Sequence, residues 1–386
     1  MRPLTYASVA LAIGLLLSWA PASYAQKAAK GKDVTFETAD GVRLSGTFYA
    51  SSSPKVNASE APAVLLLHEL EGNSNEAGWE ELATELSKRG FAVLAFDFRG
   101  HGNSTTISDL NAFWSKVENR QSIPGFIGSL PPASQKKDTI SFKDFKGRTQ
   151  YYPVLVNDIL AARMYLDKQN DAGQCNSANI FIIGAKDGAT LGAMWAVSEQ
   201  YRYPARRQFP GGPLQREQTA EGKNIAGCIW LSANGYVGSR RMSTSSHLRV
   251  LGKDKKIPMV FVYGEKDLAA KQFADSAKQS AMGDDAITKK FTVALPVKGG
   301  TEKLRGRLLL GKGLDTTEKI GNYLTNLSER LKAREAPTVK KDPDNSEFCW
   351  QMGLSRPIPF KQLVGPINNQ VQVRILTPLD ALGLTR

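Results

Sequence analysis

The chain contains 386 residues, of which 41% are hydrophobic and 23% are charged. These values are those of an ordinary globular protein, and the length suits one large α/β domain with insertions. The formal net charge is +13, but the basic residues are scattered and no nucleic-acid-binding motif accompanies them, so we expect no nucleic-acid partner. A solvated basic surface is the simplest interpretation, and contact with an anionic envelope polymer is the alternative.

Residues 1–25 have the pattern of a signal peptide. Arg2 supplies a positive charge, and residues 7–20 are almost entirely apolar but too short to span a membrane comfortably. Ser23 and Ala25 are small residues at the −3 and −1 positions of a cleavage site. We therefore expect cleavage after Ala25 and an exported mature chain, periplasmic or secreted, without a transmembrane segment. An uncleaved anchor is the alternative.

Strands and helices alternate through the central part of the chain. Alternating residues around a turn at 39–41 predict a β-hairpin over residues 33–49. Later apolar runs predict strands buried on both faces, and helical spacing lies between them. This order predicts a mostly parallel sheet with helices on both faces. The predicted buried strands are residues 63–67, 91–96, 179–183, 225–231, 258–263 and 291–295.

Two segments interrupt this alternation. Residues 103–153 are polar, contain prolines at 124, 131 and 132 and show weak periodicity, which predicts a cap-like insertion. Residues 199–223, rich in Arg, Pro and Gly, form a second insertion. Residues 336–386 change composition and contain a strand-like segment at 371–375, so we expect a C-terminal extension that packs on the body or on a partner. Residues 26–335 then form one domain.

Three cysteines are present, and an odd number leaves at least one thiol unpaired. Cys175 precedes one predicted strand and Cys228 lies in the next. An exported chain favours a disulfide between them, whereas buried unpaired thiols are the alternative. The spacing of Cys349 and the other two suits no metal site, and we expect no metal and no cofactor.

An ordered set of motifs accompanies the predicted strands and helices. It consists of the hairpin at 33–49, LLLHELEG at 65–72, DFRGHGNS at 97–104, a helix at 157–166, GAKDG at 184–188 and GEKD at 264–267. Over residues 33–335 this set resembles the α/β-hydrolase superfamily. The resemblance implies the α/β-hydrolase fold and places GAKDG at the turn from strand to helix that normally carries the nucleophile.

The acyl-transfer chemistry of that family needs a nucleophile, a His, an acid and oxyanion donors. At the apex of the turn stands Lys186, a protonated amine that attacks no carbonyl unless its pKa is strongly lowered. The resemblance would place the His near Gly299, where there is none. Glu69 replaces a usual Gly, and its charge would oppose a developing oxyanion. Asp267 alone matches, as the acid.

Asp187 and His68 are secondary candidates. The family uses the backbone N–H of the residue after the apex, so the side chain of Asp187 is not expected to face substrate. His68 and His101 fall at motif positions that brace loops, and His247 is expected at the surface. Among the three histidines of the chain, His68 is the best candidate for residual base catalysis.

We therefore expect an exported α/β-hydrolase-fold protein that lacks conventional serine-hydrolase activity and binds an unidentified small molecule or protein. The alternative is a hydrolase of ester, lipid or peptide substrates that uses Lys186, Asp187 or His68. We also expect the Lys186 ammonium to cross the space of the missing imidazole and meet Asp267, directly or through one water. Glu69 is a second acceptor in this hypothesis.

Overall fold

The computed structural model describes residues 30–123, 132–149, 151–207, 214–299, 304–331, 340–344 and 347–350. The predicted signal peptide with its cleavage site and the strand-like residues 371–375 lie outside these ranges. No helix in the described ranges combines the length and the apolar character that a membrane crossing requires.

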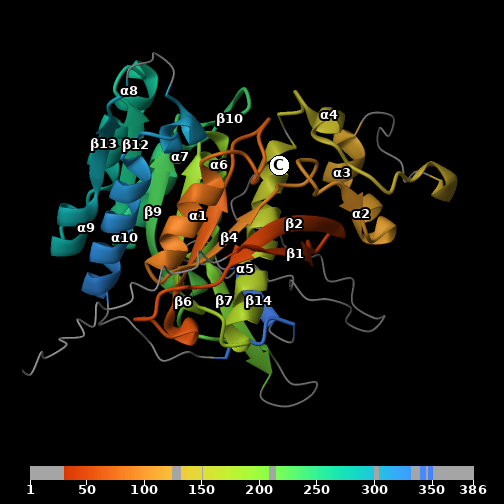
Figure 1. The fold of residues 1–386 in the computed structure, drawn as a ribbon. Helices are drawn as coiled ribbons and strands as arrows, with labels where there is room; N and C mark the ends of the chain where they lie inside the picture. The colour runs from red at the N-terminus through yellow and green to blue at the C-terminus, as the bar shows by residue number, and fades with distance from the viewer. Residues whose placement is uncertain are drawn as a thin grey trace, which may run out of the picture.

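A nine-stranded sheet forms the centre of the described structure (Figure 1). It runs in the order β1 (Lys32–Glu37), β2 (Val42–Tyr49), β4 (Ala92–Phe96), β3 (Pro62–Leu67), β6 (Asn176–Ala185), β9 (Ile225–Leu231), β12 (Met259–Gly264) and β13 (Val293–Val297), and β5 (Thr106–Ile107) pairs with β2. The pairs from β4 to β13 are parallel, and the hairpin β1–β2 joins β4 in antiparallel orientation. The predicted mostly parallel sheet is confirmed.

Helices cover both faces of this sheet. On one face α1 (Trp79–Lys88) packs beside α10 (Thr316–Leu331), and on the other α5 (Val156–Asp171) packs beside α6 (Asp187–Glu199). Side chains of β3 alternate between the two layers: Leu65 belongs to the core cluster under α5 and α6, and Val64 and Leu66 belong to the cluster under α1 and α10. Burial on both faces explains the continuous apolar runs of these strands.

The described part of the predicted cap lies beside the antiparallel edge of the sheet. It contains α2 (Leu110–Ser115), α3 (Val117–Ser122) and α4 (Phe142–Phe145), which Figure 1 shows together next to β1 and β2. From there it reaches the loop after β3, where Lys146 forms an ion pair with Glu71, 2.5 Å between Nζ and Oε1.

Part of the C-terminal extension packs on the body. Strand β14 (Glu347–Trp350) pairs with β7 (Arg202–Arg207) of the second predicted insertion, and β7 also pairs with β8 (Leu214–Arg216). The carboxylate of Asp171, at the end of α5, accepts the backbone N–H groups of Lys341 at 2.7 Å and Asp342 at 2.6 Å. The extension thereby joins the insertion and α5 to one another.

Cys175 and Cys228 are both buried and unpaired, so the disulfide alternative is wrong and the alternative of buried thiols is confirmed. The strand register gives the reason. Cys228 pairs with Ile182, seven residues beyond Cys175. Because β6 is irregular before Ile180, Asn176 and Ile182 lie opposite Pro62 and Leu65, which are three residues apart in β3. At about 3.3 Å per residue the two cysteines therefore lie at least roughly 10 Å apart along the strands, beyond the reach of a disulfide.

A fully buried guanidinium connects the hairpin, the loop after β4 and α5. Arg99 donates to Asp40 at 2.6 and 2.9 Å, to Asp158 at 2.8 Å, and to the Tyr151 hydroxyl at 3.3 Å. Burial would raise the pKa of Asp40, but the charge of Arg99 together with hydrogen bonds from Arg99, Asn119 and Thr38 holds that pKa well below its usual range. Both carboxylates therefore depend on one cation.

Replacing Arg99 should destabilise the fold strongly. We expect Arg99→Met to lower the free energy of unfolding by about 3–5 kcal/mol, because Asp40 and Asp158 would stay buried without their cation. The matched control is Arg43→Gln, which removes an exposed pair with Glu37 and should cost less than about 1 kcal/mol. Urea unfolding measures both. A loss in Arg99→Met no larger than in the control would contradict this role.

Candidate functional site

The strand–turn–helix of the nucleophile position is retained, with a lysine at its apex. Lys186 lies between β6 and α6 with φ 44° and ψ −110°, a strained conformation for a residue with a side chain. The flanking glycines are required by close packing. A Cβ at Gly188 would lie 2.4 Å from the His68 carbonyl oxygen, and one at Gly184 would lie 2.8 Å from the Ala189 nitrogen.

The Lys186 ammonium pairs with Glu69, whose Oε1 lies 3.5 Å from Nζ. The other carboxylate oxygen of Glu69 accepts the Arg307 N–H at 3.3 Å. Burial raises the pKa of Glu69, and the charge of Lys186 opposes this increase. A Cβ at Gly306, whose φ is +56°, would lie 2.9 Å from both Glu69 Oε1 and Lys186 Cε, so this backbone covers the pair closely.

Asp267 has a different cation. Its Oδ2 lies 3.0 Å from Nε of Arg305, and the predicted direct pair of Lys186 with Asp267 is therefore wrong. Asp267 also caps α8 (Leu268–Ala281), where its side chain accepts the Ala270 N–H at 3.3 Å. A guanidinium remains protonated in proteins and has no acceptor atom. The partner of the acid is thus unable to take a proton from a nucleophile.

The position where the resemblance would place the catalytic His is closely packed. A Cβ at Gly299 would lie 2.4 Å from Cδ1 of Leu304 and 3.2 Å from Cδ2 of Leu314. A side chain could therefore enter here only if Leu304 moved.

The Asp187 carboxylate lies among backbone donors. Its Oδ1 accepts the Gly238 N–H at 2.7 Å. Burial raises its pKa, and hydrogen bonds from the backbone of Gly238, Asp187 itself and Leu70 lower it in part. In α/β-hydrolases the N–H after the nucleophile and one from the loop after β3 form the oxyanion hole. Asp187 and Leu70 occupy those places, so a carboxylate of this chain already faces these donors.

His68 braces the loops at the sheet edge. Its Nε2 accepts the Phe98 N–H at 3.0 Å, which leaves the proton on Nδ1, and Nδ1 donates to the Glu69 carbonyl at 2.7 Å. Burial, and then the neighbouring His101, lower the pKa of His68 to about 4. The ring is neutral with both nitrogens engaged, so it has no free acceptor for a catalytic proton.

The other two histidines also lie away from catalytic geometry. His101 is buried, and its Nδ1 lies 2.9 Å from the Arg99 carbonyl. His247, on α7 (Thr244–Arg249), is half-buried, and burial lowers its pKa to about 4. The expected surface position of His247 therefore holds only in part, because one side of this short helix packs against the body.

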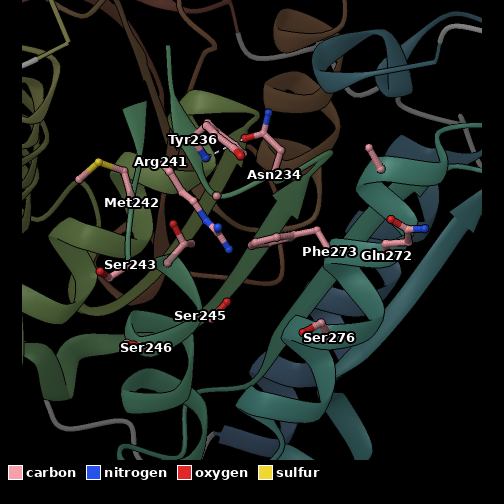
Figure 2. A pocket seen from close by; sticks show the side chains of 13 residues that line it. Asn234, Tyr236, Arg241, Met242, Ser243, Ser245, Ser246, Gln272, Phe273 and Ser276 are labelled. Atoms are coloured by element: carbon pink, nitrogen blue, oxygen red, sulfur yellow. Dashed lines mark hydrogen bonds between the residues drawn. The ribbon is translucent and has the colours of Figure 1, made fainter. Parts of the chain in front are cut away.

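A cavity of about 910 Å³ opens next to this site. Its walls are the hairpin of β10 (Tyr236–Val237) and β11 (Arg240–Arg241), helix α7 and helix α8 (Figure 2). None of its lining residues belongs to the cap-like insertion at 103–153. The hairpin contacts the elbow directly, because the backbone N–H of Gly238, between its two strands, donates to the Asp187 carboxylate.

The family model of the alpha/beta hydrolase fold matches residues 62–169, from β3 into α5. The sheet order and the elbow agree with this match. The chain has the α/β-hydrolase fold. Its elbow, its loop after β4 and its acid turn are those of an α/β-hydrolase, whereas Lys186, Glu69 and Arg305 give the site a different chemistry.

Known α/β-hydrolases and other relatives are similar to this chain only at a distance. Uncharacterized proteins from two strains of Mycobacterium tuberculosis are 39% identical over 75 residues, which is 19% of this chain and 24% of theirs. The match thus spans about a quarter of their length. A dienelactone hydrolase from Anabaena variabilis is 11% identical with a TM-score of 0.45, and covers 78% of this chain and 98% of its own. An esterase from Pyrococcus furiosus is 16% identical with a TM-score of 0.45, and covers 78% and 91%.

The sequence alone did not indicate Arg305 and Arg307. Arg305 is the N-cap of the short 3-10 helix Gly306–Leu310, and Arg307 lies in its first turn. The sequence did offer one indication. Glu69 and Asp267 are carboxylates at the expected site, and a buried carboxylate usually has a cationic partner.

Double-mutant cycles distinguish the two candidate partners of Lys186. We expect Lys186→Met and Glu69→Gln to couple by about 0.5–1 kcal/mol, a modest value because the side chain of Lys186 is 35% exposed. The matched cycle of Lys186→Met with Asp267→Asn should show coupling near zero. Unfolding free energies of the single and double variants measure both, and the reverse order of couplings would contradict this assignment.

Proposed function

We propose that this protein is an exported α/β-hydrolase-fold protein without conventional serine-hydrolase activity, and that it binds a ligand instead of hydrolysing it. The observation that carries this proposal is the Asp187 carboxylate at the oxyanion donors. An oxyanion hole works because preorganised donors meet a charge that develops in the transition state. Here a carboxyl group of the chain itself already engages these donors, so they are not free for a second oxygen.

The lack of a proton acceptor supports the same proposal. Nζ of Lys186 pairs with Glu69, the carboxylate of Asp267 pairs with Arg305, and both nitrogens of His68 are engaged by the backbone. Nucleophilic catalysis by a hydroxyl needs a base within hydrogen-bond reach. Restoring only the hydroxyl would therefore leave the site without a base.

The hydrolysis experiment follows from this. We expect neither the wild type nor Lys186→Ser to turn over short-chain aryl esters above background or to react with a fluorophosphonate probe. A serine esterase measured in parallel is the positive control. Turnover that persists through purification and disappears in Lys186→Ala, Asp187→Asn or His68→Gln would overturn the proposal and favour an unconventional hydrolase.

Export is the second part of the proposal, supported by the charged, apolar and small-residue pattern of residues 1–25. Intact-mass analysis of the protein from the extracytoplasmic fraction should give a chain that starts at Gln26. A cell-associated chain that keeps Met1 would contradict cleavage.

A further inference from the structure

The cavity between the hairpin and α8 is lined mainly by uncharged polar side chains, whereas the site at Lys186 consists of paired charges. Its volume of about 910 Å³ is within the usual range of ligand sites, about 300–1,000 Å³. No lining residue is acidic, and eight of the 13 carry an uncharged hydroxyl or amide: Asn234, Tyr236, Ser243, Thr244, Ser245, Ser246, Gln272 and Ser276. Such a wall offers many donors and acceptors and favours a ligand with several hydroxyl groups.

Thr244 gives an independent sign of an unfilled polar site. The residue lines the cavity and is only 2% exposed, yet its hydroxyl has no hydrogen-bond partner in the described structure. Buried polar atoms without partners are uncommon in folded proteins and call for an explanation. A bound hydroxyl group would supply the partner.

Arg241 and Phe273 give the cavity its specificity. Arg241 is the one cationic lining residue, and among the described residues it has no ion-pair partner. Figure 2 shows the half-buried Phe273 projecting from α8 toward Arg241 on the opposite wall. A guanidinium binds a carboxylate through two parallel hydrogen bonds, and an aromatic face packs against the C–H face of a sugar ring.

We propose that this cavity binds an acidic carbohydrate, a sugar whose carboxylate meets Arg241 and whose ring lies on Phe273. One cation among many hydroxyls fits a single carboxylate on a polyhydroxylated ring better than a small inorganic anion, for which several cations would be expected. This inference rests on the proposed binding function. In it, the elbow supports the wall of the cavity. Asp187, through Gly238, positions the hairpin that carries Arg241.

The experiment is calorimetric titration of the mature protein with three probes: digalacturonic acid, its neutral counterpart galactobiose, and inorganic phosphate. We expect digalacturonic acid to bind most tightly. Arg241→Gln should weaken its binding at least tenfold and leave galactobiose unchanged, whereas Phe273→Leu should weaken both sugars. The matched control is Arg240→Gln, next in sequence but not lining the cavity, which should change neither. Thermal unfolding of each variant confirms that it is folded.

Three results would overturn the inference: no binding of either sugar at millimolar concentration, equal effects of Arg240→Gln and Arg241→Gln, or phosphate binding as tightly as digalacturonic acid with the same dependence on Arg241. Hydrolysis of the disaccharide and of aryl esters is measured on the same samples. If neither sugar binds and hydrolysis stays at background, only this inference is overturned. If either substrate is hydrolysed above background, the proposed function is overturned.

Discussion

The guanidinium of Arg99, buried between Asp40 and Asp158, is the constraint on which the site depends. From Arg99 a continuous set of backbone contacts leads to the elbow. The carbonyl of Arg99 holds His101, the neighbouring Phe98 N–H holds His68, and His68 in turn holds the carbonyl of Glu69. The position of the Glu69 carboxylate opposite Lys186 is thus set by a charge cluster on the far side of the loop. Burying these ions is costly, and the cost is offset because every acceptor is matched.

The site keeps the backbone of an α/β-hydrolase and changes the charges that the backbone presents. The strained apex, the glycine packing and the capping aspartate of α8 are all present. The nucleophile and oxyanion positions bear a pair of opposite charges, the acid meets an arginine, and the His position is a closely packed glycine. Lys186 meets Glu69, and Asp267 meets Arg305. These ion pairs connect loops to one another. The concave, polar surface next to the elbow is the adjoining cavity.

The fold was predictable because its signals are local. Strands buried on both faces produce continuous apolar runs, and a strand that turns sharply into a helix needs small residues at Gly184 and Gly188. Glu69 was predicted as a second acceptor for Lys186, whereas the counter-ion of Asp267 could not be predicted, because the position of Arg305 beside it depends on tertiary packing. The disulfide prediction failed since strand order alone does not give register, and register separates Cys175 from Cys228.

The matched charges around Lys186 also constrain how this sequence can change. Removing Lys186 leaves the buried Glu69 without its cation, and removing Arg305 does the same to Asp267. A histidine at position 299 would first have to displace Leu304. Each single step toward a working triad therefore lowers stability before it restores any chemistry, and the steps gain value only in combination. Less stable intermediate sequences therefore separate the present elbow from a catalytic one.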